Sequence, residues 1–409
     1  MTSEQRVVVI GGGLAGLRLA ARLGGSAEVT VLGEESHVPY NRVLLAEVLA
    51  GRYAPEVAAL PAPGPALRRG VRAVRVDRAD RLVHCDDGAA LAYDTLVLAT
   101  GSNPVLPPLR GLFDPGGRDL PEGVHAFRTM DDCLALSAAV RPGVRAVVIG
   151  GGLLGVSAAR ALAARGAQVV LAQQAERLME RQLDAGASAL LDAHLTGLGV
   201  EIHTECRVRG LTTQPAASAP GLRKVTGVEL ADGYRLDADL VVLACGVRPR
   251  TGLAQAAGLD VLTGIVVDGL LRTSDPRIHA IGDCAEHAGR VYGLAGPALE
   301  QADALAATLT GSPTEYTGTR ALTRLTLGGA DAHFDLAAFG EPNPRPGDDV
   351  VRLADATRRT YRTVVVRGDR LVGGVLLGEL STVGALARTW EGDESPHDLF
   401  HLLTDDGGH

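Results

Sequence analysis

Two glycine clusters constrain the fold of this chain more than any other feature of its sequence. Gly11-Gly12-Gly13 follows the β-branched run 6–10, and Gly150-Gly151-Gly152 follows the similar run 145–149. Each cluster is followed by an alanine-rich amphipathic stretch and then by another apolar run. The order strand, glycine turn, helix, strand therefore occurs twice, and such repeated βαβ units build parallel sheets. We expect an α/β protein with two Rossmann-like domains.

The first cluster has the spacing of a dinucleotide-binding turn. Gly11 permits a tight turn, Gly13 lets the backbone approach a pyrophosphate, and Gly16 lets the helix pack on the strand. The phosphate charge then lies at the N-terminus of the helix. The next strand ends in Glu34-Glu35, close to the offset of about 20 residues expected for a carboxylate that binds a ribose hydroxyl. The motif residues are Gly11, Gly13, Leu14, Ala15 and Gly16.

The second cluster repeats this context but lacks the acidic residue. Its motif residues are Gly150, Gly152, Leu153, Leu154 and Gly155. The matching strand ends in Gln173-Gln174, and a neutral amide binds a ribose hydroxyl without repelling a 2′-phosphate. The sequence therefore does not separate NADH from NADPH. Arg177 either helps to hold a phosphate or is a solvated residue at the start of a helix.

Composition and charge exclude several classes of function. The net charge is −8 with a pI of about 5.8, and no basic stretch is interleaved with aromatic residues, so we expect neither nucleic acid nor membrane partners. The chain runs from Met1 directly into a strand, from which we expect a cytoplasmic protein. The five cysteines form no C-x-x-C pair, which argues against iron–sulfur and zinc sites. His279, Cys284 and His287 match no common metal spacing, so we expect no metal.

The chain resembles a known superfamily in several further motifs. One is a buried strand ending in a small polar turn, 96–101, and another is a strand that delivers an aspartate after a glycine, 278–283. With the paired glycine clusters, these make the chain similar to the flavoprotein disulfide reductases that have two dinucleotide folds. Within that superfamily it resembles the FAD-containing part of NAD(P)H nitrite reductase large subunits and assimilatory nitrate reductase electron-transfer subunits. The most specific segments are 39–45, 178–184, 246–250, 271–276, 282–285 and 335–341.

The resemblance implies FAD and NAD(P)H as cofactors and gives each motif residue a role. The first glycine turn would bind the FAD pyrophosphate, Glu34 and Glu35 the adenosine ribose, and Asp283 the ribityl chain. Ala73 would contact the adenine through its backbone. The other residues implied to contact FAD are Arg42, Thr100, Gly101, Arg128, Gly282, Leu294 and Ala295. The second glycine turn, Gln173 and Gly246 would bind NAD(P).

The same resemblance divides the chain into three parts. It implies a discontinuous FAD-binding domain at 1–118 and 240–312, an NAD(P)-binding domain at 119–239, and a small C-terminal α+β interface domain at 313–395. Short alternating strands at 322–327, 360–367 and 371–377 support the third domain. We expect a loosely ordered tail at 396–409.

The sequence departs from the family at positions that bear on its chemistry. No cysteine occurs before Cys85, so a redox-active disulfide is not expected and the flavin itself must pass on electrons. Ser157 stands where many relatives have a glutamate that contacts the nicotinamide, and Glu47 stands where several have a lysine. The cysteine-rich regions of nitrite reductases are absent, so we do not expect this chain alone to reduce nitrite.

Three functions remain open on this evidence. The first is an NAD(P)H:acceptor oxidoreductase that passes electrons from FAD to a separate redox protein, such as a nitrite or nitrate reductase component, a ferredoxin or a rubredoxin. The second is a biosynthetic or oxygen-using flavoenzyme with an altered nicotinamide pocket. The third is a non-catalytic flavin-binding subunit. A homodimer is compatible with all three.

Overall fold

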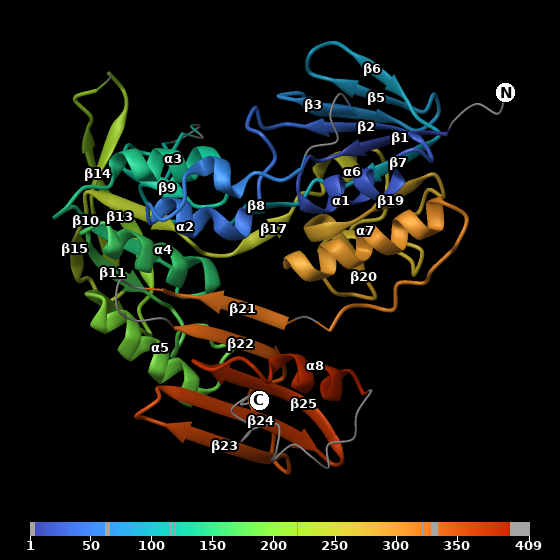
Figure 1. The fold of residues 1–409 in the computed structure, drawn as a ribbon. Coiled ribbons are helices and arrows are strands. Elements are labelled where there is room, and N and C mark those ends of the chain that lie inside the picture. The colour runs from blue at the N-terminus through green and yellow to red at the C-terminus, as the bar shows by residue number, and fades with distance from the viewer. Residues whose placement is uncertain are drawn as a thin grey trace. The chain divides into compact units, whose positions relative to one another are not determined.

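The computed structural model describes residues 5–392, apart from 62–65, 115–116, 118, 219, 321 and 329–333. The expected tail at 396–409 therefore lies outside the described residues. The chain forms two compact units (Figure 1). Unit 1 comprises Met1–Val48, Tyr53–Asn103 and Val247–Ala321, and unit 2 comprises Leu49–Arg52, Pro104–Gly246 and Leu322–His409. Each unit contains one of the two glycine clusters, so each can be described on its own.

Unit 1 is built on a five-stranded parallel sheet. Its strands follow the order β19, β7, β1, β2, β3, with β1 (Arg6–Ile10) in the centre. β1 is flanked by β7 (Thr95–Leu98) and β2 (Glu28–Gly33), and its residues Val7 to Ile10 are buried. β-Branched residues favour such a doubly covered strand, which accounts for the apolar run in the sequence. The outer strands are β3 (Leu67–Arg69) and β19 (Ile278–Ala280).

Two helices of unit 1, α1 (Leu14–Leu23) and α7 (Ala295–Leu309), lie side by side (Figure 1). Arg18 and Arg22, one turn apart on α1, both donate hydrogen bonds to the Asp303 carboxylate of α7 at 2.8 Å. The Arg18 and Arg22 guanidinium groups lower the pKa of Asp303 to about 2. These ion pairs, together with the buried alanines of both helices, fix α1 against α7.

The remaining elements that begin in unit 1 are short. A three-stranded antiparallel sheet of β4, β5 and β6 follows β3 in sequence. The bounds are η1 Arg42–Leu44, α2 Leu45–Leu49, η2 Pro55–Ala58, β4 Ala73–Asp77, β5 Leu82–Cys85, β6 Ala90–Ala92, β8 Ser102–Pro104, β17 Val247–Pro249, α6 Gly252–Ala256, β18 Ile265–Val267, η4 Gly282–Cys284 and β20 Ala285–His287.

Unit 2 repeats the parallel architecture. Its sheet follows the order β12, β11, β10, β16, β9, with all neighbouring strands parallel. The bounds are β9 Val124–Ala126, α3 Met130–Ala139, β10 Arg145–Ile149, α4 Leu153–Ala164, β11 Gln168–Ala172, α5 Ala185–Gly197, β12 Val200–His203 and β16 Leu240–Leu243. An antiparallel sheet of β13 (Val208–Pro215), β14 (Arg223–Leu230) and β15 (Arg235–Asp237) completes this part. The expected α/β fold with two Rossmann-like sheets is thereby confirmed.

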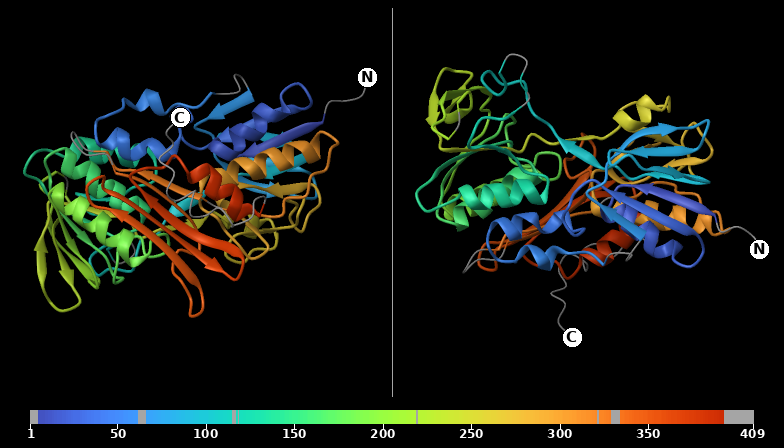
Figure 2. Two further views of the ribbon diagram at one scale, coloured as in Figure 1. Left: turned by 60° about the horizontal axis from the view of Figure 1, so that its bottom comes forward. Right: turned by 90° about the horizontal axis from the view of Figure 1, so that it is seen from above.

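The C-terminal part of unit 2 is a five-stranded antiparallel sheet. Its order is β21, β22, β25, β24, β23, and the helix α8 lies beside it (Figure 2). Val383 and Leu386 of α8 belong to one buried cluster with apolar residues of the sheet. The bounds are β21 Leu322–Thr326, β22 Asp335–Gly340, β23 Asp349–Asp355, β24 Thr360–Arg367, β25 Arg370–Leu377 and α8 Val383–Glu391. The strands expected at 360–367 and 371–377 agree with β24 and β25. Residues 313–320, which we expected to open this domain, lie in unit 1 instead, and the division into three domains stays a prediction.

A buried tyrosine joins the C-terminal sheet to the nucleotide fold of unit 2. The Tyr361 hydroxyl on β24 donates to Oδ2 of Asp184 at 2.6 Å, and both residues are 4% exposed. Asp184 also caps α5 by accepting from the Ala187 N–H at 2.9 Å. Burial, followed by the neighbouring Asp184 carboxylate, raises the pKa of Tyr361, so its hydroxyl keeps its proton and remains a donor.

Replacing Tyr361 with Phe should destabilise unit 2. The change leaves the buried Asp184 carboxylate with one donor fewer, which costs about 1–3 kcal/mol. We expect the unfolding temperature of unit 2, followed by circular dichroism, to fall by several degrees. The matched control is Tyr234→Phe, at a tyrosine of the same unit that is 58% exposed. Equal unfolding temperatures for the two variants would contradict the role given to Tyr361.

Candidate functional site

The first glycine turn connects β1 to α1 and has the shape of a phosphate cradle. Gly11 has φ +129°, and a Cβ there would overlap the carbonyl oxygen of Ala99. A Cβ at Gly16 would overlap the carbonyl oxygen of Gly11, so these two positions admit only glycine. At Gly13, by contrast, a Cβ would meet no atom within 4 Å. The turn is therefore closed on its protein side and open above Gly13.

The N-terminal turns of α1 and α7 meet at Gly282. This glycine has φ +78°, and a Cβ on it would lie 3.2 Å from the Cβ of Ala15 on α1 and 3.9 Å from that of Ala298 on α7. No side chain caps either helix, so their first backbone N–H groups are available to a ligand. Leu294 is the N-cap of α7 and Ala295 its first residue. Two positive helix ends thus converge beside the Gly282-Asp283 turn, an arrangement suited to an anion.

Asp283 is held by a residue that the sequence did not single out. Its Oδ2 accepts a hydrogen bond of 2.9 Å from Ser102, which is 7% exposed. Next to it, the Thr100 hydroxyl donates to the carbonyl oxygen of Arg250 at 2.7 Å, while Gly101 has φ +72° and open space where a Cβ would lie. Thr100, Gly101 and Asp283 are therefore brought together at the C-terminal ends of neighbouring parallel strands, where ligands bind in open α/β sheets.

The acidic end of β2 is also organised by arginines. Oε2 of Glu34 lies 2.6 Å from Nη2 of Arg250, and both side chains are partly exposed. Glu35 accepts hydrogen bonds of 2.5 Å from the Tyr40 hydroxyl and from Arg42. Both carboxylates are thus oriented by donors and keep lone pairs for a ribose hydroxyl. Arg42 lies beside Glu35, close to the predicted ribose site.

Ala73, the predicted adenine contact, begins β4 near this acidic cluster. The preceding segment is joined to the end of β2, because the Val71 N–H donates to the Gly33 carbonyl at 3.0 Å and the Gly70 N–H to the Glu35 carbonyl at 3.1 Å. A register shift falls between Ala73 and Arg75, which is the kind of irregularity that leaves backbone groups outside the ladder. The surroundings of Ala73 suit a backbone contact to a ligand.

Taken together, the residues of unit 1 fit a dinucleotide. The open space above Gly13, the two uncapped helix ends and the oriented carboxylates of Glu34 and Glu35 occur in the order in which a dinucleotide presents its phosphates and adenosine ribose. Asp283 offers a further carboxylate near the N-terminal end of α1, since its neighbour Gly282 lies against Ala15 in the first turn of that helix. These contacts with FAD remain predictions.

The second glycine turn, in unit 2, repeats this geometry between β10 and α4. Gly150 has φ +109°, a Cβ on Gly155 would overlap the carbonyl oxygen of Gly150, and a Cβ on Gly152 would meet no atom within 4 Å. No side chain caps α4, whose first residues are Leu153 and Leu154. Gly246, which follows β16, has φ +94° and open space where a Cβ would lie. This turn also fits a pyrophosphate.

The side chains around the second turn point inward. Oε1 of Gln173 accepts from the Gly151 N–H at 2.8 Å, and Nε2 donates to the Arg177 carbonyl at 3.3 Å. The Ser157 hydroxyl, 7% exposed, donates to the Leu153 carbonyl at 2.8 Å along α4. Gln173 keeps one amide N–H and one lone pair of Oε1 for a nucleotide ribose, so this site offers an uncharged amide where unit 1 offers carboxylates.

Arg128 lies in unit 2, apart from the other residues predicted to contact FAD. Its backbone N–H donates to the Asp132 carboxylate at 2.9 Å, in the capping box that starts α3. Its contact with FAD stays a prediction. Glu47 is part of the short helix α2.

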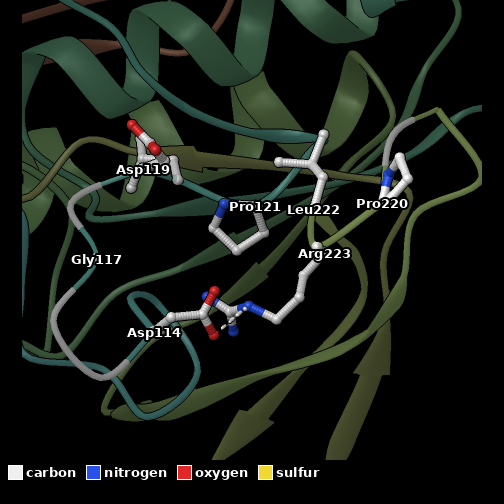
Figure 3. A pocket seen from close by; sticks show the side chains of 9 residues that line it. Asp114, Gly117, Asp119, Pro121, Pro220, Leu222 and Arg223 are labelled. Carbon is white, nitrogen blue, oxygen red and sulfur yellow. Dashed lines mark ion pairs between the residues drawn. The ribbon is translucent and has the colours of Figure 1, made fainter.

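A cavity of about 270 Å³ in unit 2 is lined by residues of the segments 114–121 and 220–223, which are not part of a glycine turn (Figure 3). An ion pair of 2.8 Å between Arg223 Nε and Asp114 Oδ1 lies at one side of it, and Pro121 and Leu222 line another. Arg223 also donates to the Gly111 carbonyl at 2.8 Å. This ion pair ties the connector before β9 to β14, so it has a structural role.

The comparisons with known proteins agree with this geometry. The family model described as pyridine nucleotide-disulphide oxidoreductase matches residues 5–302. The chain belongs to this family. It is 34% identical over 387 residues to the assimilatory nitrate reductase electron transfer subunit of Bacillus subtilis, covering 92% of this chain and 48% of that protein. It is 33% identical over 327 residues to the putidaredoxin reductase of Pseudomonas putida, covering 76% and 75% of the two chains.

Solved structures of family members have the same fold. The crystal structure of the covalent putidaredoxin reductase–putidaredoxin complex matches with a TM-score of 0.83 at 26% identity, over the full length of both chains. The chain spans about half the length of the Bacillus subtilis relative. The family's name refers to disulphides, but all five cysteines of this chain are free. Burial raises the pKa of the Cys245 thiol to about 11 and also raises that of Cys284, which makes both poor nucleophiles.

No helix among the described residues is long and apolar enough to cross a bilayer. No group of three His, Cys, Asp or Glu side chains in the same residues could hold a metal ion. His279 is 4% exposed on β19, and burial lowers its pKa, as suits a core residue.

Proposed function

We propose that this protein is an FAD-dependent NAD(P)H:acceptor oxidoreductase that passes electrons to a separate redox protein. FAD, when bound, supplies the chemistry, since it accepts hydride and releases electrons one at a time. The observation that carries the proposal is the pair of glycine turns, each closed by backbone on one side and open above its middle glycine. Unit 1 would hold FAD and unit 2 would hold NAD(P)H.

The two units differ in the groups they offer to a nucleotide. Unit 1 adds the Asp283 carboxylate and a second helix end, which a flavin nucleotide requires beyond its pyrophosphate. Unit 2 adds only the fixed amide of Gln173. The role of the chain's own residues is to bind and orient both cofactors, and we assign no side chain a direct part in hydride transfer. The cysteines are free and burial raises the pKa of their thiols, which agrees with a reaction in which no side chain takes a direct part.

The separate electron acceptor is proposed from the relatives. One relative is named an electron transfer subunit and another a putidaredoxin reductase, so both names describe delivery to another protein. A [2Fe–2S] ferredoxin, a rubredoxin and a nitrite or nitrate reductase component are the acceptors we propose. The test is to mix each acceptor with catalytic amounts of this protein and excess NADH or NADPH without oxygen. We expect at least one acceptor to be reduced at a rate proportional to enzyme. If NAD(P)H reduces the flavin of this protein but none of the acceptors is reduced, the proposal of a separate acceptor protein of these classes is contradicted.

Gln173 should set the preference between the two nicotinamide nucleotides. Because its amide presents an N–H and no charge, we expect the wild type to use both NADH and NADPH. Gln173→Glu places a carboxylate near the 2′ position and should lower kcat/KM for NADPH relative to NADH on the order of tenfold. Steady-state kinetics with both nucleotides measures the ratio. Gln174→Glu, at the exposed neighbouring residue, is the control, and an equal change in the two variants would refute the role of Gln173.

A second candidate is an FAD enzyme with its own small substrate in place of the nicotinamide. The observation that favours it is the inward orientation of Gln173 and Ser157, which leaves the second site without a carboxylate. Stoichiometric reduction of the flavin by NADH in the absence of any other substrate would argue against this candidate.

A further inference from the structure

Behind the Gly282-Asp283 turn lies a chain of hydrogen bonds that the predicted cofactor contacts do not use. The Gly282 N–H donates to Oε1 of Gln301 on α7 at 2.7 Å, and Gln301 is 1% exposed. The Gln301 side chain adjoins the hydroxyl of Tyr316, a residue that is 5% exposed, and lowers the pKa of this hydroxyl against the larger raising effect of its burial. The turn is therefore fixed from inside unit 1 by two buried side chains.

The chain of hydrogen bonds continues to a surface carboxylate, and its direction follows from proton counting. Thr319 donates its single hydroxyl hydrogen to Oε2 of Glu300 at 2.6 Å, because a carboxylate can only accept. The contact of 2.7 Å between the Tyr316 hydroxyl and Thr319 Oγ1 must then have Tyr316 as donor. The Tyr316 oxygen then keeps its lone pairs for the neighbouring Gln301 amide, which lowers the pKa of this hydroxyl as a donor would. The donors of the three hydrogen bonds from Gly282, Tyr316 and Thr319 point the same way, towards Glu300.

Hydrogen bonds aligned in this way polarise one another, and an interruption in the middle weakens both ends. The alignment also matters for the turn itself. Gly282 has φ +78°, a conformation that glycine adopts without strain, and Gln301 fixes the orientation of the turn by accepting the one N–H of that residue. The Asp283 carboxylate then faces Ser102 on the other side. The position of Asp283 thus depends on side chains that it does not contact directly.

The same network fixes residues 313–320, one of the segments that connect unit 1 to unit 2. The Thr319 N–H donates to the Tyr292 hydroxyl at 3.1 Å. The Tyr316 ring packs edge-on against the rings of His287 and Tyr292, with ring centroids 5.0 Å and 6.4 Å apart, respectively. The segment leading to β21 is therefore tied by side chains to the turn that presents Asp283.

We propose that Gln301 is a positioning residue for the bound flavin and acts through Gly282, with Tyr316 and Thr319 holding it in place. The proposal rests on the proposed function, namely that unit 1 binds FAD. It predicts that FAD affinity and the electronic environment of the flavin depend on buried groups that do not touch the cofactor. The residues that would support FAD binding in this way, Gln301, Tyr316 and Thr319, lie outside the glycine motifs.

The test is a double-mutant cycle on FAD binding to the full-length apoprotein. Gln301→Met keeps the length of the side chain but removes the acceptor of the Gly282 N–H and the amide beside Tyr316, and Tyr316→Phe removes only the hydroxyl. We expect Kd for FAD, measured by flavin fluorescence, to rise roughly tenfold in the first variant and about threefold in the second. The double variant should have the same Kd for FAD as Gln301→Met alone, because the effects of substituting coupled residues do not add. The absorption band of the bound flavin should shift in each variant.

Tyr93→Phe is the matched control, since Tyr93 is a tyrosine of unit 1 that is 1% exposed and lies outside the network. Additive effects on Kd, or variants with wild-type Kd and an unshifted flavin band, would overturn the proposal. If Gln301→Met does not fold, Tyr316→Phe and Thr319→Val complete the cycle. A wild-type apoprotein that takes up no FAD would instead overturn the proposed function, so the two failures are distinguishable.

Discussion

A Gly13→Asp protein is expected to fold and to purify without FAD. The space above Gly13 is open, and its φ of −85° suits any residue. Aspartate is moreover a favoured N-cap, so its carboxylate should bind the free N–H groups of α1. The same carboxylate occupies the predicted place of the pyrophosphate and repels it. We expect Kd for FAD to rise at least about 100-fold, equivalent to about 2.8 kcal/mol.

The measurement for this variant is the ratio of flavin to protein absorbance after purification, followed by titration of the apoprotein with FAD. Circular dichroism and the unfolding temperature of the apoprotein report whether the fold is retained. A folded Gly13→Asp protein that contains FAD at the wild-type ratio would show that the pyrophosphate does not bind at the β1–α1 turn.

The corresponding change in unit 2, Gly152→Asp, is expected to leave FAD bound and to slow its reduction by NAD(P)H. Gly152 has φ −79° and the same open space as Gly13, so the local geometry of the two variants is matched. At subsaturating nucleotide we expect the rate of flavin reduction to fall about 100-fold. Reduction by dithionite, which does not need the nucleotide site, should be unchanged.

Each of these variants is the control for the other. Stopped-flow absorbance at the flavin band measures the rate for Gly152→Asp with NADH and with NADPH. If Gly152→Asp instead loses FAD, or reduces its flavin at the wild-type rate, the assignment of the second turn to NAD(P)H is wrong.

The parts of the fold that could be predicted from the sequence are those whose causes are local. Gly11 and Gly150 take positive φ because each turns directly from a strand towards a helix against the backbone of a neighbouring strand. The β-branched runs around them form the central strands of parallel sheets. Three strands of the C-terminal sheet, β21, β24 and β25, were likewise predicted from alternation, with β24 at the expected residues, whereas β22 and β23 were not predicted as strands.

The side-chain partners within the candidate sites could not be predicted, because they join distant parts of the chain. Arg250 is 216 residues from Glu34, and its role was missed although its segment was recognised as a motif. Ser102 directly follows Gly101, a position that could have drawn attention to it. Gln173 was expected to meet the ribose, but sequence gives no signal that its carbonyl would bond the Gly151 N–H. Such rotamer choices depend on packing that only the folded chain defines.

The most direct test of the account is an anaerobic titration of the wild-type holoprotein with NADH and, separately, with NADPH. The account predicts that the flavin absorption band bleaches with about one equivalent of either nucleotide, since hydride transfer to FAD is stoichiometric. The band should return when an acceptor protein is added. An FAD-containing protein whose band persists in excess NADH and excess NADPH would contradict the account.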